Sequence, residues 1–190
     1  MNDGPSNSVC VFCGSSRVVD PQYFALASSV GAMIAKKSLR VVYGGASVGM
    51  MGALADAALA HGGRVFGVIP RSLDQRELTH KGLTELSLVE TMYQRKEQMF
   101  RGSGAFVALP GGFGTLDELF EALTERQIGM HDKRVVLLEH NGFWSGLREW
   151  VERAVRERFV PDNVAHALEV VDGVEGLDRW LDGWRASSAR

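Results

Sequence analysis

Two adjacent basic residues, Arg95 and Lys96, lie on the predicted apolar side of a helix. In the segment 91–100, Met92 and Met99 fall on one helical stripe, and the two cations lie between them. Charges beside an apolar face are costly unless an anion or a hydrogen-bond partner offsets them. Long side chains can also carry their charged ends to solvent. Two cations together favour a site for a carboxylate or a phosphate.

A carboxylate that could pair with these cations lies in the segment Thr115-Leu116-Asp117-Glu118, where another helix is expected to begin. Thr115 and Glu118 match a capping box, in which the two side chains satisfy free N–H groups of the first turn. Alternatively, Glu118 is a catalytic group beside a bound anion. One face of this helix is apolar, so we expect Glu118 to point away from the sheet, toward solvent or a second subunit. The residues of that face are Leu116, Leu119, Phe120, Leu123 and Gln127.

Three segments rich in small residues could bind a phosphate: Gly14-Ser15-Ser16, Gly44 to Gly49, which includes Gly45, and Pro110 to Thr115, which includes Gly111. Glycine allows the backbone to approach an anion closely, so N–H groups can converge on it. A single segment of this kind is more typical of a tight turn; three at one sheet edge favour phosphate binding. None matches an ATP-binding loop with Gly-Lys-Ser/Thr or the G-x-G-x-x-G dinucleotide motif.

The elements that carry these segments alternate between short apolar runs and longer helical patterns. This order predicts an α/β fold, a single-domain Rossmann-like doubly wound parallel sheet of about seven strands. Ligands then bind beyond the carboxyl ends of the strands. Helices are expected from about Pro21, Met50, Thr91, Thr115, Phe143 and Val174. The expected strands are Val9 to Cys13, Arg40 to Tyr43, Arg64 to Ile69, Leu83 to Val89, Ala105 to Leu109, Arg134 to Leu138 and Leu168 to Val171.

The 190 residues fit one catalytic domain at 8–185, between disordered ends at 1–7 and 186–190. A formal charge of −2 gives no basic surface for nucleic acid, and no apolar run predicts a membrane span or signal sequence, so we expect a cytoplasmic protein. Cys10 and Cys13 are predicted to be buried on opposite sides of a strand. They lack partners at zinc-ligand spacing, so no metal site is expected.

The segment Pro110 to Glu118 reads PGGFGTLDE, which matches the motif PGGxGTxxE, and the Arg95-Lys96 pair lies upstream of it. With these residues the chain resembles the Lonely Guy family of cytokinin riboside 5'-monophosphate phosphoribohydrolases. The resemblance extends from the first strand to about Leu138 and includes Gln127-Ile128-Gly129-Met130-His131.

The resemblance implies a homodimer, with possible higher assembly, that needs no metal or organic cofactor. Its substrate would be a purine nucleoside 5'-monophosphate, either N6-modified AMP or AMP, cleaved into free base and ribose 5-phosphate. Arg95 and Glu118 would be catalytic. Substrate binding would involve Glu77, Lys96, Thr124 and the motif loop Gly112, Phe113, Gly114, Thr115, Leu116, Asp117 and Glu118.

The chain departs from the family pattern at two places. It has Tyr93-Gln94 where relatives commonly have His-Glu, and Glu125 follows Thr124 where they commonly have Trp. Base selection is therefore not fixed by the resemblance. The rival hypothesis is a nucleotide sensor or carrier on the same scaffold, which the retained Arg95 and Glu118 disfavour. Relatives labelled lysine decarboxylase would need pyridoxal phosphate on a lysine, for which Lys96 is the only candidate in the expected site.

Overall fold

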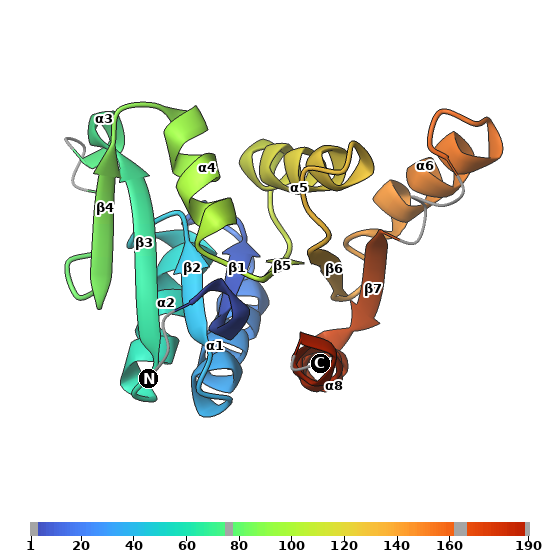
Figure 1. Ribbon diagram of the computed structural model, residues 1–190. Helices are drawn as coiled ribbons and strands as arrows, with labels where there is room; N and C mark the ends of the chain where they lie inside the picture. Colours follow the sequence, from blue (N-terminus) through green and yellow to red (C-terminus); the bar gives the residue numbers. More distant parts are fainter. Residues whose placement is uncertain (1–3, 75–77, 162–166, 189–190) are drawn as a thin grey trace.

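The protein folds around one seven-stranded sheet, seen in a computed structural model that describes residues 4–74, 78–161 and 167–188 (Figure 1). The strand order is β4-β3-β2-β1-β5-β6-β7, and all six pairings are parallel. The strands are β1 Ser8–Phe12, β2 Arg40–Tyr43, β3 Arg64–Pro70, β4 Glu85–Val89, β5 Ala105–Ala108, β6 Arg134–Glu139 and β7 Leu168–Asp172. The predicted fold class is confirmed, and each predicted strand is present with ends shifted by at most two residues.

The direction of chain progression reverses at the centre of the sheet. From β1 the chain moves outward through β2 and β3 to β4, then returns to β5 on the other side of β1. At such a reversal the loops that follow the two central strands diverge and leave a crevice at the carboxyl edge. The loops after β1 and β5 are the first and third of the predicted phosphate-binding segments.

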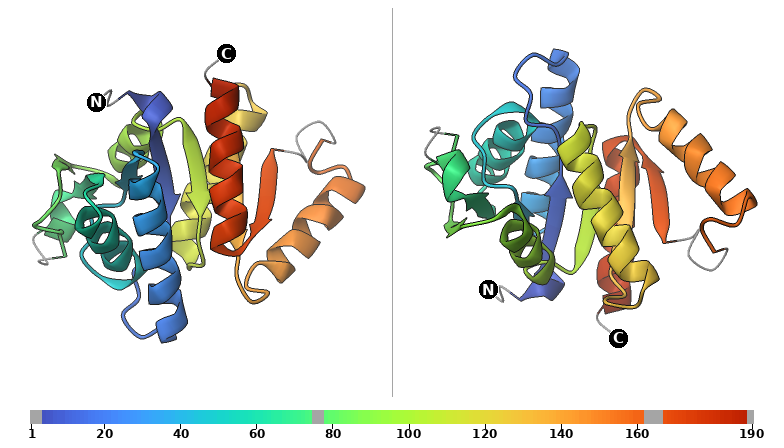
Figure 2. Two further views of the ribbon diagram at one scale, coloured as in Figure 1. Left: turned by 90° about the horizontal axis from the view of Figure 1, so that it is seen from below. Right: turned by 90° about the horizontal axis from the view of Figure 1, so that it is seen from above.

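Helices cover both faces of the sheet. One core cluster contains residues of α1, α2 and α8, and the other contains residues of α4 and α5. The two views of Figure 2 show α1, α2 and α8 in front of one face and α4 and α5 in front of the other, with α6 beside β7. The helices are α1 Pro21–Lys36, α2 Gly49–Ala60, α3 Arg71–Asp74, α4 Met92–Arg101, α5 Phe113–Gln127, α6 Ser145–Arg156 and α8 Gly173–Ser188.

Local sequence explains where the main helices begin. Asp20 accepts a hydrogen bond from the N–H of Gln22 and precedes Pro21, whose fixed φ suits the first helical position. Thr91 and Gln94 form a complete capping box at the start of α4. Helices α1 and α4 therefore each begin at a defined residue, which fixes the side chains of their first turns.

The two cysteines lie on opposite sides of the sheet, as predicted. Both are free and buried, with Cys10 in the core under α4 and α5 and Cys13 in the core under α1 and α2. The predicted disorder at the two ends is wrong for the described residues. Pro5–Asn7 form a 3₁₀ helix, and α8 continues to Ser188 because its apolar side packs on the core.

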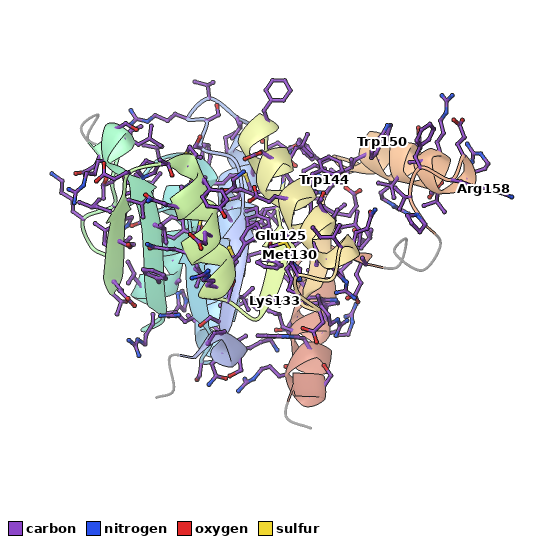
Figure 3. All side chains as sticks on the ribbon, turned by 45° about the horizontal axis from the view of Figure 1, so that its top comes forward. Glu125, Met130, Lys133, Trp144, Trp150 and Arg158 are labelled. Carbon is purple, nitrogen blue, oxygen red and sulfur yellow. The ribbon has the colours of Figure 1, made fainter. Side chains whose placement is uncertain are left out.

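Helix α6 extends away from the rest of the molecule. Of its residues only Ala154 is buried, and Trp150 contacts α5 through the edge of Phe120. Figure 3 shows Trp150 and Arg158 on this projecting segment and Trp144 closer to the sheet. In the described part of the chain, no helix is long and apolar enough to cross a membrane.

Candidate active site

The three glycine-containing segments meet at the carboxyl edge of the sheet. The N–H of Gly14 donates to the carbonyl of Pro110 at 3.2 Å, and the N–H of Met50 donates to the carbonyl of Gly14 at 3.0 Å. Gly49 has φ +63° and lies against the backbone of Ser15, where a side chain would overlap. The predicted convergence of these loops is confirmed.

The converging loops surround a cavity of about 730 Å³. This volume is in the range typical of small-molecule sites. Its polar lining residues include Ser15, Ser16, Arg17, Arg95, Thr115 and Glu118. The remaining wall is largely apolar and includes Val19, Tyr23, Val48, Met50, Met51, Ile69, Leu73, Leu78 and Phe143.

Helix α5 begins at the cavity without a side-chain cap. Its N-cap is Gly112, so the N–H groups of the first turn are left for another acceptor. Thr115 is buried and lies so close to Gly111 that a Cβ there would overlap its hydroxyl. The capping box considered for Thr115 and Glu118 is therefore wrong. The uncapped turn can bind an anion, which the helix dipole also favours.

Glu118 turns inward to Arg95, contrary to the expectation that it points away from the sheet. The side chain of Glu118 is 3% exposed and that of Arg95 is 7% exposed. Arg95 Nη1 lies 3.2 Å from Glu118 Oε1, and Arg95 Nε donates to the carbonyl of Val68 at 3.1 Å. The buried face of α5 consists of Thr115, Glu118, Leu119 and Ala122. Leu116 and Leu123 are only partly buried beside this face, so apolar residues alone do not define it.

Gly44 makes room for the guanidinium of Arg95. A Cβ built on Gly44 would overlap Arg95 Nη2 and approach Cζ to 2.8 Å. Gly44 was interpreted from the sequence only as part of a phosphate-binding loop. The sequence around Gly44 could not show this contact, because Arg95 lies on α4, far along the chain.

Burial raises the pKa of Glu118 to about 7, despite the opposing effect of Arg95. Asp117 raises this pKa further, whereas Lys96 lowers it. A carboxyl group that titrates near neutral pH can hold or release a proton under the conditions in which an enzyme works. Glu118 is therefore the described carboxylate of this cavity best suited to acid–base chemistry.

Lys96 belongs to a separate charged group on the outer side of α4 and α5. Its Nζ lies 2.9 Å from Asp117 Oδ2 and also pairs with Glu121. Burial lowers its pKa, but the two carboxylates outweigh this effect and raise it. Asp117, Leu116 and Thr124 line a shallower groove of about 420 Å³, which shares Phe113 with the main cavity.

The predicted site residues thus fall into two groups. Arg95, Glu118 and the loop Gly111, Gly112, Phe113, Gly114 and Thr115 line the main cavity. Leu116, Asp117 and Thr124 line the outer groove, and Lys96 pairs with Asp117 beside it. Gly45, with φ +76°, does not line the cavity, although Gly44 and Ala46 do. Glu77 lies outside the described residues.

The structure adds several wall residues that sequence motifs did not indicate. Tyr23 and Phe143 pack edge to face with ring centroids 5.8 Å apart at one end of the cavity. Leu73 and Leu78 line it from the segment between β3 and β4. Among residues 4–74, 78–161 and 167–188, no three His, Cys, Asp or Glu side chains gather where they could hold a metal ion.

Known proteins resemble the chain at the level of sequence. A family model described as possible lysine decarboxylase matches residues 51–179. The cytokinin riboside 5'-monophosphate phosphoribohydrolase of Rhodococcoides fascians is 46% identical over 170 residues, covering 89% of this chain and 86% of that protein. The enzyme with this name from Mycobacterium marinum is 42% identical over 168 residues, covering 88% and 89%. LOG1 of Arabidopsis thaliana is 39% identical over 176 residues, covering 93% and 83%.

Solved structures resemble the chain at the level of fold. The molybdenum cofactor binding protein of Rippkaea orientalis aligns with a TM-score of 0.71 at 18% identity, over 96% of this chain and 98% of that one. The molybdenum cofactor carrier protein of Chlamydomonas reinhardtii gives 0.73 at 20% identity, over 94% and 98%. Taken with the sequence relatives, the cavity and its motif loop identify the chain as a member of the family of cytokinin riboside 5'-monophosphate phosphoribohydrolases.

Proposed function

We propose that the protein hydrolyses the N-glycosidic bond of a purine nucleoside 5'-monophosphate and releases free base and ribose 5-phosphate. N6-modified AMP is the expected substrate, together with AMP. The observation that carries the proposal is the buried Arg95–Glu118 pair, which faces the same cavity as the uncapped first turn of α5. One end of this cavity suits a phosphate, and the carboxylate beside it suits a cationic reaction centre.

The chemistry requires a carboxylate near C1' of the ribose. When the C–N bond breaks, its electron pair leaves with the base, and positive charge develops on the sugar. Glu118 stabilises this charge and orients the attacking water, whose oxygen bonds to C1'. The water gives up a proton and the departing base takes one, so the products balance with one water consumed. A pKa of about 7 allows Glu118 to accept that proton.

Arg95 has a positioning role in this proposal. Its bond to the Val68 carbonyl fixes the guanidinium on the end of β3, and its Nη1 fixes Glu118. A buried, pre-positioned charge pair does not need to reorganise during the reaction, which is the main source of electrostatic catalysis. The remaining guanidinium N–H groups can donate to ribose oxygens.

The phosphate is proposed to bind at Gly111 to Thr115. The uncapped N–H groups of α5 and the hydroxyl of Thr115 are the available donors there. Binding energy from this remote group can then orient the ribose against Glu118. Phe113, which is 93% exposed at the mouth of the cavity, is in a position to cover a bound nucleotide.

Decarboxylation with pyridoxal phosphate, which the name of the family model implies, does not fit these residues. The cofactor would need a lysine in the cavity, and none of the described lining residues is a lysine. Lys96 lines neither the cavity nor the outer groove and is held by Asp117 and Glu121, which raise its pKa. A lysine must lose its proton before it can form a Schiff base.

The direct test is to incubate the purified protein with AMP, with N6-isopentenyladenosine monophosphate and with adenosine, and to measure free base by chromatography. We expect base release from both monophosphates and a kcat/KM for adenosine at least about 10²-fold below that for AMP, because adenosine lacks the anchoring phosphate. Equal rates for AMP and adenosine would contradict the role of the α5 loop. Tight AMP binding without base release would instead support a nucleotide carrier.

We further propose that the protein is a cytoplasmic homodimer. Exposed apolar side chains on α4 and after α5, including Met92, Tyr93, Ile128 and Met130, support a partner surface. Replacing these apolar residues with charged ones should convert the dimer to a monomer, as measured by sedimentation velocity. A wild-type protein that sediments as a monomer at micromolar concentration would contradict the proposal.

A further inference from the structure

A short segment between α3 and β4 is held against the loop after β2, and we call residues 78–80 the strap. The N–H of Ser47 donates to the carbonyl of Leu78 at 2.8 Å, and the N–H of His80 donates to the carbonyl of Gly45 at 3.0 Å. Between these bonds Ala46 and Thr79 form an antiparallel bridge outside the main sheet. The strap therefore lies beside Gly44, which contacts Arg95.

His80 fixes the end of the strap by its side chain. Its Nε2 lies 2.9 Å from Asp56 Oδ1 on α2, and its Nδ1 accepts from the N–H of Gly82 at 3.0 Å. Accepting at Nδ1 requires the proton to be on Nε2, so the ring donates to Asp56. The ring is buried although Asp56 is exposed. His80 thus joins the strap to α2 through two side-chain hydrogen bonds.

Leu78 is the strap residue that reaches the cavity. On the proposed function, the phosphate lies at the start of α5 and C1' lies beside Glu118. The base is attached at C1' and the phosphate-bearing C5' at C4', on opposite sides of the ring oxygen, so the base extends from Glu118 away from the phosphate. Across the sheet from β5 through β1 and β2 to β3, that direction leads past Gly44, which follows β2, to the wall that contains Ile69 and Leu78. The opposite end, at Tyr23 and Phe143, would separate the glycosidic bond from Glu118.

From these contacts we infer that the His80–Asp56 pair is a positioning device for base recognition, which holds Leu78 against the base of the nucleotide. The inference rests on the proposed function only for the direction of the bound nucleotide. Arg95 keeps its own bonds to Val68 and Glu118, so His80 acts on binding of the base rather than on the reacting bond.

The test compares AMP with ribose 5-phosphate, which has the same phosphate and sugar but no base. Dissociation constants are measured by titration calorimetry in a Glu118→Gln background, in which turnover is expected to be slow. We expect His80→Ala and Asp56→Ala to raise the Kd of AMP about fivefold to tenfold, as for partial loss of an apolar contact, and to leave ribose 5-phosphate within about twofold. Asp56→Asn keeps an acceptor oxygen for Nε2–H and should restore the affinity for AMP.

A double-mutant cycle decides whether His80 acts through Leu78. Leu78→Ala should weaken the binding of AMP as much as His80→Ala does. In the Leu78→Ala background, the further substitution His80→Ala should change the Kd of AMP little. Asp182→Ala is the matched control. Like Asp56, Asp182 is an exposed carboxylate that pairs with a largely buried side chain: its Oδ1 lies 2.6 Å from Nζ of Lys37. This pair is on α8 and at the end of α1, away from the strap. This substitution should change neither the Kd of AMP nor that of ribose 5-phosphate.

Two results would overturn the inference: an equal loss of affinity for ribose 5-phosphate, or additive effects of His80→Ala and Leu78→Ala. Melting temperatures of all variants identify losses caused by unfolding. Base release by the wild-type protein is measured separately. A protein that shows the contrast between AMP and ribose 5-phosphate but releases no base would refute hydrolysis while supporting the role of His80 and Leu78.

Discussion

Neighbouring residues on α4 and α5 form two charged groups with opposite surroundings. Arg95 and Glu118 are buried and face the cavity, whereas Lys96 pairs with Asp117 and Glu121 on the outer groove. One residue along a helix turns a side chain by about 100°, so a single step in sequence separates the two groups. The difference teaches that charge type and motif membership alone do not assign a residue to the reaction. Burial against the cavity does.

Removing one carboxylate from each group should give the largest contrast. Glu118→Gln is expected to lower kcat by about 10² or more, because the amide cannot stabilise positive charge or accept a proton. Asp117→Asn should lower kcat by no more than about threefold, since its side chain faces the groove. Steady-state assays of base release on both variants, with circular dichroism as the check on folding, make the comparison. Similar losses of kcat in the two variants would contradict the different roles of Glu118 and Asp117.

The pH dependence should report the buried group. The pKa of Glu118 is raised to about 7, so the carboxylate form is present above this pH and is lost as the pH falls. We expect kcat/KM to be constant above about pH 8 and to decrease about tenfold per unit well below pH 7. Initial rates between pH 5 and 9 measure this limb. A profile that stays flat down to pH 5 would show that Glu118 does not act as a carboxylate.

Gly44→Ala tests how closely the buried pair must be held. The new methyl group would displace the guanidinium of Arg95 from Glu118, and we expect kcat to fall about tenfold with a small change in melting temperature. Gly146→Ala on α6 is the matched control, because no atom lies within 4 Å of a Cβ there. It should leave kcat unchanged and slightly stabilise the helix. An active Gly44→Ala variant would mean that Arg95 tolerates displacement.

Lys96→Met should show that the outer charged group has a small effect on the pKa of Glu118 in the cavity. Lys96 lowers the pKa of Glu118, whereas Asp117 and Glu121 raise it. Without the cation, the acid limb of kcat/KM should move to higher pH by a fraction of a unit. The same pH series measures the shift, and Lys133→Met, farther from the cavity, provides the comparison. A limb that moves to lower pH would contradict the assignment of this limb to Glu118.

The sequence predicted most of the fold because buried parallel strands and amphipathic helices leave strong local patterns. Runs such as Val9 to Cys13 are apolar at nearly every position, as strands covered on both faces must be. The short helix Arg71–Asp74 was missed, since four residues leave no periodic pattern. The 3₁₀ turn at Pro5–Asn7 was missed for the same reason.

The sequence correctly predicted which loops meet at the candidate site, but it did not predict that the side chain of Glu118 points into that site. Hydrophobic periodicity assigned the buried face of α5 to Leu116, Leu119, Phe120, Leu123 and Gln127. Of these only Leu119 is fully buried, and it shares the buried face with Thr115, Glu118 and Ala122. A charged residue is buried here because Arg95 arrives from another helix, and no local pattern encodes that meeting. Leu78 and His80 were missed similarly, because their contacts depend on the loop after β2.

The cavity walls come from segments far apart in the chain, from Cys13 to Phe143, on both sides of the central strand. A nucleotide bound there would bridge the two halves of the sheet, and ligand that binds only the folded chain stabilises it by mass action. Substrate supply would then influence how long the protein survives in the cell, as well as how fast it turns over. The same loops would link metabolite level to protein lifetime.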